Sequence, residues 1–233
     1  MENIRIIGTS HVAKASMEEV RNAILKDKPD ILALELDQGR LHSLLHENKP
    51  KGRVPISQIG FKGYLFYLIG SWMQKKIGRM IGVLPGAEMK LAIKLAHRHD
   101  IRVALIDRDI RVTLKRFSQS IGWKEKWHLA ADLIKGLLFG EREMKKLGVD
   151  KLDLSKVPDE EIIQKLITQV KDRYPGTYSS LIEERNQIMA SNILKLVMQE
   201  PDKKILVIVG AGHKQAIEEE LETAQSMEMA VAS

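Results

Sequence analysis

Four short apolar segments constrain the fold of this chain more than any other feature of its sequence. They are rich in Ile, Val and Leu and occupy residues 4–7, 31–36, 103–106 and 205–209. Continuous apolar runs of this length are typical of strands that are buried on both faces of a parallel sheet. The sequence therefore predicts an α/β fold with a central, mostly parallel sheet.

Helical patterns separate these segments. A capping-box pattern, Ser16-x-x-Glu19, predicts the start of a helix that Pro29 ends. A second amphipathic pattern begins at Gly86 and leads into the third strand. A strand–helix–strand unit has a right-handed crossover that makes its two strands parallel. We therefore expect the sheet to be wrapped by helices.

Two stretches interrupt this alternation within what we interpret as a single domain over residues 1–233. Residues 49–84 are aromatic, basic and punctuated by glycine, which favours a helical cap inserted over a cleft. An alternative is a basic amphipathic helix that binds a membrane surface or pairs two copies of the chain as a homodimer. Residues 117–200 are mostly of helical pattern and are predicted to form a second insertion.

Composition excludes several classes of function. The chain has no cysteine, so it has neither a thiolate metal site nor a cysteine nucleophile, and any metal must be held by His, Asp or Glu. The net charge of +6 over 233 residues and the 5% aromatic content do not indicate nucleic-acid binding. Neither a signal peptide nor a transmembrane run is present, which predicts a soluble domain as given.

Polar residues follow each predicted strand. His11 and His213 each end a Gly-x-x-His sequence after a strand, and Glu35 closes the second strand. Because the carboxyl ends of parallel strands share one edge of a sheet, these side chains are expected to converge. Two imidazoles and one carboxylate bind a divalent first-row metal with positions open for water and substrate. Glu35 is alternatively a general base, and either histidine alternatively only caps a helix.

Other charged residues are second-choice candidates. Arg108 follows the third strand, where a guanidinium would hold a substrate carboxylate or an oxyanion. Glu88 lies in the first turn of a predicted helix, where the helix dipole favours a carboxylate in any case. Glu184 and Arg185 lie within a helical pattern and are more typical of a solvated face.

Taken in order, these motifs resemble the TraB/PrgY pheromone-shutdown family, which is related to the Tiki metalloproteases. The matching blocks are Gly8-Thr-Ser-His11, Ser16-x-x-Glu19, Ala33-Leu-Glu35-Leu-Asp37, Gly86-Ala-Glu88, Ile106-Asp-Arg108, Glu184-Arg-Asn186 and Val209-Gly-Ala-Gly-His213. The resemblance implies a fold similar to the erythromycin esterase and ChaN-like group. It also implies membrane association, because many relatives continue into membrane-spanning helices.

The resemblance implies a site and an activity as well. Its first-choice residues are His11, Glu35 and His213, and its polar partners are Glu88, Arg108, Glu184 and Arg185. The implied reaction is cleavage of a peptide near its N-terminus with manganese or cobalt, while the donor set also suits zinc or iron. Asn186 stands where the family usually has Asp, which removes one carboxylate.

Three functions remain open at this stage. The first is a metal-dependent peptidase that cleaves short peptides or peptide N-termini. The second is a non-enzymatic module that binds and sequesters a peptide resembling a pheromone. The third is a metal-free, esterase-like hydrolase with a histidine as general base.

Overall fold

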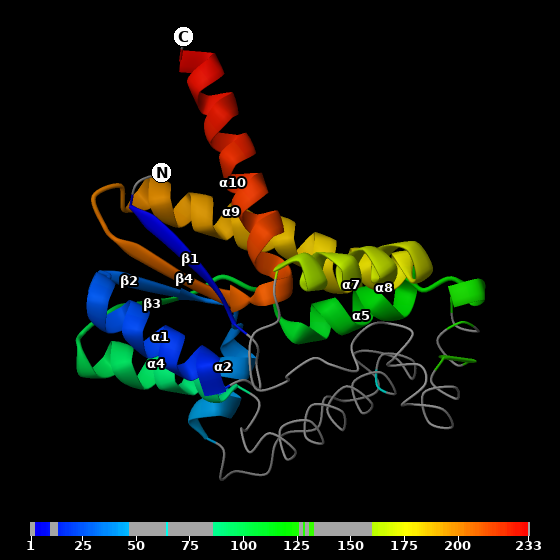
Figure 1. The fold of residues 1–233 in the computed structure, drawn as a ribbon, viewed down its shortest axis with the longest axis horizontal. Coiled ribbons are helices and arrows are strands. Elements are labelled where there is room, and N and C mark those ends of the chain that lie inside the picture. The colour runs from blue at the N-terminus through cyan, green and yellow to red at the C-terminus, as the bar shows by residue number, and fades with distance from the viewer. Residues whose placement is uncertain are drawn as a thin grey trace.

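The computed structural model describes residues 3–9, 14–46, 64, 86–125, 128, 131–132 and 160–232. It contains a four-stranded sheet in the order β1-β4-β2-β3, in which all neighbouring strands are parallel (Figure 1). The strands are β1 (Ile4–Thr9), β2 (Ile31–Leu34), β3 (Arg102–Leu105) and β4 (Ile205–Gly210). The predicted α/β class with a parallel central sheet is confirmed.

Helices cover both faces of this sheet. The described helices are α1 (Lys14–Asp27), α2 (Gln38–Leu45), α4 (Ala87–Arg98), α5 (Ile110–Ser120), α7 (Glu160–Arg173), α8 (Pro175–Tyr178), the π-helical turn η1 (Ser179–Glu183), α9 (Glu184–Gln199) and α10 (Ala211–Ala232). Helices α1 and α4 lie on one face, and α9 and the first part of α10 lie on the other (Figure 1). The far end of α10 projects beyond the sheet (Figure 1).

The core divides into two clusters because side chains along a strand point alternately to opposite faces. Leu32 and Leu34 pack with α1 and α4. Ile31 and Ala33, on the same strand, pack with α9 and α10. Strands β2 and β4 are completely buried because they lie inside the sheet, whereas β1 and β3 are edge strands with partly exposed residues. Burial on both faces is thus confirmed for the inner strands and is wrong for the edge strands.

Two local details differ from the sequence predictions. Helix α1 begins at Lys14 rather than at Ser16, and Ser16 is completely buried within its first turn. Strand β2 ends at Leu34, so Glu35 stands immediately beyond the strand instead of inside it. That position places a carboxylate at the carboxyl edge of the sheet.

Much of the predicted cap and of the helical insertion lies outside the described residues. Of residues 49–84, the structure describes Tyr64 alone. Within residues 117–200, helix α9 packs its buried face directly on the sheet through Met189 and Ile193. Among the described residues, no helix is long and apolar enough to cross a membrane.

The start of α8 packs tightly against the end of α5. The buried carboxylate of Glu125 accepts hydrogen bonds from the backbone N–H groups of Gly176, at 3.0 Å, and Thr177, at 2.8 Å. A Cβ atom added at Gly176 would lie 2.4 Å from the carbonyl oxygen of Ser120. Since that atom belongs to the backbone, the segment leaves no room for a side chain.

We expect Gly176→Ala to lower the free energy of unfolding by about 1–3 kcal/mol, because the added methyl group forces α8 away from α5. Urea denaturation followed by circular dichroism measures this change. Gly122→Ala is the matched control, since a Cβ at Gly122 meets nothing within 4 Å. Equal stability of the two variants would contradict the proposed crowding at Gly176.

Candidate functional site

The carboxyl edge of the sheet gathers polar side chains from four separate segments. Glu35 follows β2, Asp107 follows β3, Arg185 lies in the first turn of α9, and His213 lies in the first turn of α10. All four are buried or nearly so. Strand β4 lies between β1 and β2, which brings the start of α10 next to Glu35.

The second Gly-x-x-His sequence forms the start of a helix rather than an open turn. Strand β4 ends at Gly210 and α10 begins at Ala211, so the helix itself positions His213. Gly8 in the first such sequence has a separate role. A Cβ atom there would lie 3.1 Å from the Cα of Ala211, so glycine allows α10 to begin close against β1.

Glu35 is held in one orientation by both of its oxygens. Its Oε2 accepts a hydrogen bond of 2.6 Å from the backbone N–H of Gly210. Its Oε1 accepts a hydrogen bond from Nη2 of Arg185 and lies 3.5 Å from Nε2 of His213. The carboxylate and the imidazole predicted to converge are therefore neighbours.

Arg185 is the centre of the cluster. Its Nε donates to Asp107 at 3.1 Å, and its Nη2 donates to Asp107 at 2.6 Å and also to Glu35. Its Nη1 donates to the carbonyl of Leu181 at 3.1 Å and lies 3.0 Å from Nε2 of His213. All five N–H groups of a guanidinium are thereby engaged.

The charge of Arg185 is secured by its surroundings. Burial alone would lower the pKa of Arg185, but the charges of Glu35 and Asp107 and their hydrogen bonds raise this pKa by more. The net effect holds the pKa of Arg185 well above its ordinary value. The guanidinium therefore remains a cation inside the site.

His213 has a defined tautomer because an arginine only donates hydrogen bonds. Nε2 of His213 must accept from Nη1 of Arg185, so it carries a lone pair. Nδ1 then carries the hydrogen and donates it to Oδ1 of the buried Asn186, at 2.6 Å. These two contacts fit a ring with its hydrogen on Nδ1.

Sequence reasoning missed Asp107, Arg40 and Asn186 as site residues. Asp107 also accepts hydrogen bonds from Arg40 and, at 2.8 Å, from the backbone N–H of Arg108. Arg40 also pairs with Asp37 at 2.7 Å, and Asp37 caps the start of α2. The position of Asp107 after β3 was an available signal. Arg40 and Asn186 lie within helical patterns, and only the family resemblance pointed to residue 186.

Arg108 and Glu184 form an adjacent pair that ties α5 to α9. Arg108 donates to Glu184 at 2.8 Å, to the hydroxyl of Thr113 at 2.9 Å and to the carbonyl of Ser180 at 2.9 Å. Burial alone would raise the pKa of Glu184, but hydrogen bonds from Arg108 and Arg116 lower this pKa by more, so the net shift is downward.

Two predicted site residues remain, Glu88 and His11. Glu88 is buried in the first turn of α4, on the face of the sheet that α1 and α4 cover. His11 lies outside the described residues. Within the part of the chain that the structure describes, no group of three His, Asp or Glu side chains could hold a metal ion.

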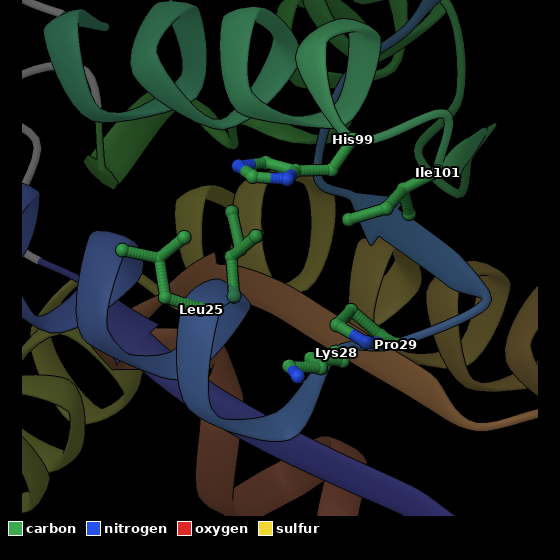
Figure 2. Close-up of a pocket in the computed structure, with 6 residues that line it drawn as sticks. Leu25, Lys28, Pro29, His99 and Ile101 are labelled. Atoms are coloured by element: carbon green, nitrogen blue, oxygen red, sulfur yellow. The ribbon is translucent and has the colours of Figure 1, made fainter.

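A cavity of about 250 Å³ lies at the other end of the strands, where β2 and β3 begin. It is formed where α1 and α4 end and where the chain enters β2 and β3 (Figure 2). Its lining residues are Ile24, Leu25, Lys28, Pro29, His99 and Ile101. This cavity, which has both apolar and polar lining residues, is separate from the polar cluster at the carboxyl edge.

Comparison with known proteins gives one family over nearly the whole chain. The model of the TraB/PrgY/gumN family matches residues 2–231. Uncharacterized protein MJ1365 of Methanocaldococcus jannaschii is 35% identical over 218 residues, which cover 92% of this chain and 52% of that protein.

Mammalian proteins described as TraB domain-containing are also similar to this chain. A TraB domain-containing protein of Bos taurus is 26% identical, over 92% of this chain and 61% of that protein. The Homo sapiens protein of the same description is 24% identical, over 94% of this chain and 63% of that protein. The chain thus spans between half and two thirds of the length of these relatives.

The lowered pKa of Glu184 predicts a pH-dependent contribution to stability. A carboxylate with a depressed pKa in the folded state stabilises the protein above the ordinary glutamate pKa, and this stabilisation is lost as the pH falls through the depressed value. We expect Glu184→Gln to be about 1 kcal/mol less stable than the wild type at pH 7. The difference should shrink toward zero in acid.

Urea denaturation at a series of pH values between 7 and 3 measures this difference. Glu183→Gln removes the same charge one residue earlier and serves as the control. A difference between Glu184→Gln and the wild type that is as large at pH 3 as at pH 7 would show that the ion pairs do not stabilise the fold.

The hydrogen bond from His213 to Asn186 predicts one imidazole tautomer. Long-range proton–nitrogen NMR spectra should show Nδ1 of His213 protonated and Nε2 unprotonated at neutral pH. In Asn186→Ala this preference should weaken, and unfolding should need about 1–3 kcal/mol less free energy, because a buried donor loses its acceptor. An Nε2-protonated ring in the wild type would contradict the described geometry.

Proposed function

The chain belongs to the TraB/PrgY/gumN family, and we propose that the cluster around Glu35 and His213 hydrolyses peptide bonds with the help of a divalent metal ion. One observation carries this proposal. Nε2 of His213 lies 3.5 Å from Oε1 of Glu35, and Nδ1 contacts Asn186 at 2.6 Å. A nitrogen and an oxygen donor are thus neighbours at the carboxyl edge.

The chemistry of these donors suits such an ion. Imidazole nitrogen and carboxylate oxygen bind manganese, cobalt, zinc and iron, and manganese or cobalt is our first choice. Ligating histidines commonly donate their other N–H to a supporting acceptor, as His213 does to Asn186. A bound ion would lower the pKa of a water molecule and polarise the scissile carbonyl.

His11 completes the donor set in this proposal on sequence alone. It follows β1 by two positions, and β1 pairs with β4, whose last residue Gly210 precedes α10 and His213. The carboxyl ends of β1 and β2 lie at the same end of the parallel sheet. Its side chain itself lies outside the described residues.

Separate catalytic roles are proposed for Glu35 and Arg108. Glu35, which is oriented by Gly210 and Arg185, is proposed to accept a proton from an attacking water molecule. Arg108 is proposed to stabilise negative charge on the substrate or the tetrahedral intermediate. Three of its N–H groups donate to Thr113, Glu184 and Ser180. Each terminal nitrogen has a second N–H, which makes no hydrogen bond within the described residues and is proposed to donate to a substrate.

A metal-free hydrolase is the second candidate, and one contact favours it. Nη1 of Arg185 lies 3.0 Å from Nε2 of His213, so a cation already neighbours this lone pair. In that mechanism Nε2 of His213 would itself accept the proton of the attacking water. Peptide capture without cleavage would use the same edge but would form no product.

We expect His213→Ala and Glu35→Gln to reduce hydrolysis of a fluorogenic peptide library by at least about a hundredfold, since each removes a proton-accepting or ligating group. The assay measures initial rates with manganese, cobalt and zinc added separately. His97→Ala, at an exposed position in the last turn of α4, is the matched control and should retain the wild-type rate.

Chelation distinguishes the candidates. If the rate vanishes on exhaustive chelation and returns with metal, the metal-dependent reaction is supported. A rate that survives chelation but requires His213 favours the metal-free hydrolase. Peptide binding with no product, even with metal supplied, would refute hydrolysis and favour a sequestering module.

A further inference from the structure

The cavity next to the start of β2 and β3 combines aliphatic side chains with two basic ones. Ile24 is buried and Ile101 is half-buried, whereas Leu25 is 45% exposed although its side chain is aliphatic. Lys28 comes from the end of α1 and His99 from the end of α4, and Figure 2 shows them on opposite sides of the space. The described lining contains no acidic side chain.

The two basic side chains are not used by the fold. Within the described residues, neither the ammonium group of Lys28 nor the imidazole of His99 makes a hydrogen bond or an ion pair. Asp27, the acidic neighbour of Lys28 in the sequence, pairs with Arg5 instead, at 2.6 Å. Asp100 follows His99 but is exposed and does not line the cavity. Both basic groups can therefore bond to an incoming anion.

The backbone of Lys28 is strained, which glycine would relieve. Its φ angle is 45°, in the left-handed region that glycine adopts at little cost and other residues adopt with strain. Glycine is also the usual residue directly after a helix. The helix dipole favours a basic residue at this end of α1, but Lys26 already lies in the last turn. A lysine side chain at position 28 therefore points to a use outside the helix itself.

We propose that this cavity binds a small carboxylate that carries a short aliphatic chain. The ligand carboxylate accepts hydrogen bonds from Lys28 and His99, which both offer N–H donors. The flexible stem of Lys28 lets its ammonium group follow the carboxylate. The aliphatic chain packs on Ile24, Leu25 and Ile101, which removes the exposed Leu25 from water.

The volume of the cavity limits the size of the ligand. At about 250 Å³ it is smaller than the roughly 300–1,000 Å³ of pockets for drug-sized molecules. Two sources present a carboxylate on a small aliphatic group: a free short-chain acid, and the C-terminal aliphatic residue of a peptide. The cavity lies at the other end of the strands from the cluster around Glu35, so binding here does not depend on the proposed hydrolysis.

The test is a titration of the 233-residue chain with sodium hexanoate, followed by NMR of its isoleucine and leucine methyl groups. We expect saturable shifts at the methyl groups of Ile24, Leu25 and Ile101. Hexanol and hexylammonium carry the same chain without the carboxylate, and they should bind at least about threefold more weakly. Hexylammonium that binds as tightly as hexanoate would overturn recognition of a carboxylate.

Variants of the two basic residues separate binding from folding. Lys28→Gly removes the ammonium group and suits the left-handed backbone, so hexanoate should bind at least about threefold more weakly while the melting temperature does not fall. His99→Ala should weaken binding to a similar degree. The matched controls are Lys26→Ala and His97→Ala, which change exposed residues that do not line the cavity and should bind as the wild type does. Unchanged affinity in either folded variant of Lys28 or His99 would overturn the assigned pair.

A second probe distinguishes the two sources of the carboxylate. N-acetyl-leucine carries its carboxylate as the C-terminus of a peptide does. Tighter binding of hexanoate than of N-acetyl-leucine supports a free short-chain acid, and the reverse order supports a peptide C-terminus. The absence of saturable shifts with both carboxylates would refute the proposed site.

Discussion

A buried guanidinium between two carboxylates organises the carboxyl edge of this fold. An unpaired charge at the position of Arg185 would be costly, and it is tolerated because Glu35, Asp107, His213 and the Leu181 carbonyl take up all of its donors. Each acceptor belongs to a different element or follows one. The ends of β2 and β3, the π-helical turn and α10 are therefore held in register by one side chain.

This arrangement depends on the order of the strands. Because β4 lies beside β2, the backbone N–H of Gly210 reaches the carboxylate of Glu35 although the two residues are 175 positions apart. Parallel pairing puts the carboxyl ends of β2 and β4 at the same end of the sheet. Because α10 begins directly after β4, its first turn holds His213 near Glu35. The local sequence supplies the donors, but the sheet topology brings them together.

The apolar strands and the residues at their ends were predictable, whereas the bonding of the site was not. Periodicity identifies buried strands, and the parallel-sheet rule then places Glu35 and His213 on one edge. By local pattern, Arg185 and Asn186 resemble an ordinary charged helix turn, because their burial comes from the packing of α9 on the sheet and α10, which local spacing does not show. The second Gly-x-x-His sequence looked like a loop for a similar reason, since no local pattern shows that α10 starts at Ala211.

The identity of residue 186 bears on the charge around His213. An asparagine contacts Nδ1 of the ring at 2.6 Å without adding charge, and the carboxylate of Glu35 lies 3.5 Å from Nε2. An aspartate at this position would add a second negative charge next to the ring and favour a cation there more strongly. The guanidinium of Arg185 already lies 3.0 Å from Nε2, so the chain balances the charges of Glu35 and Asp107 with its own arginine.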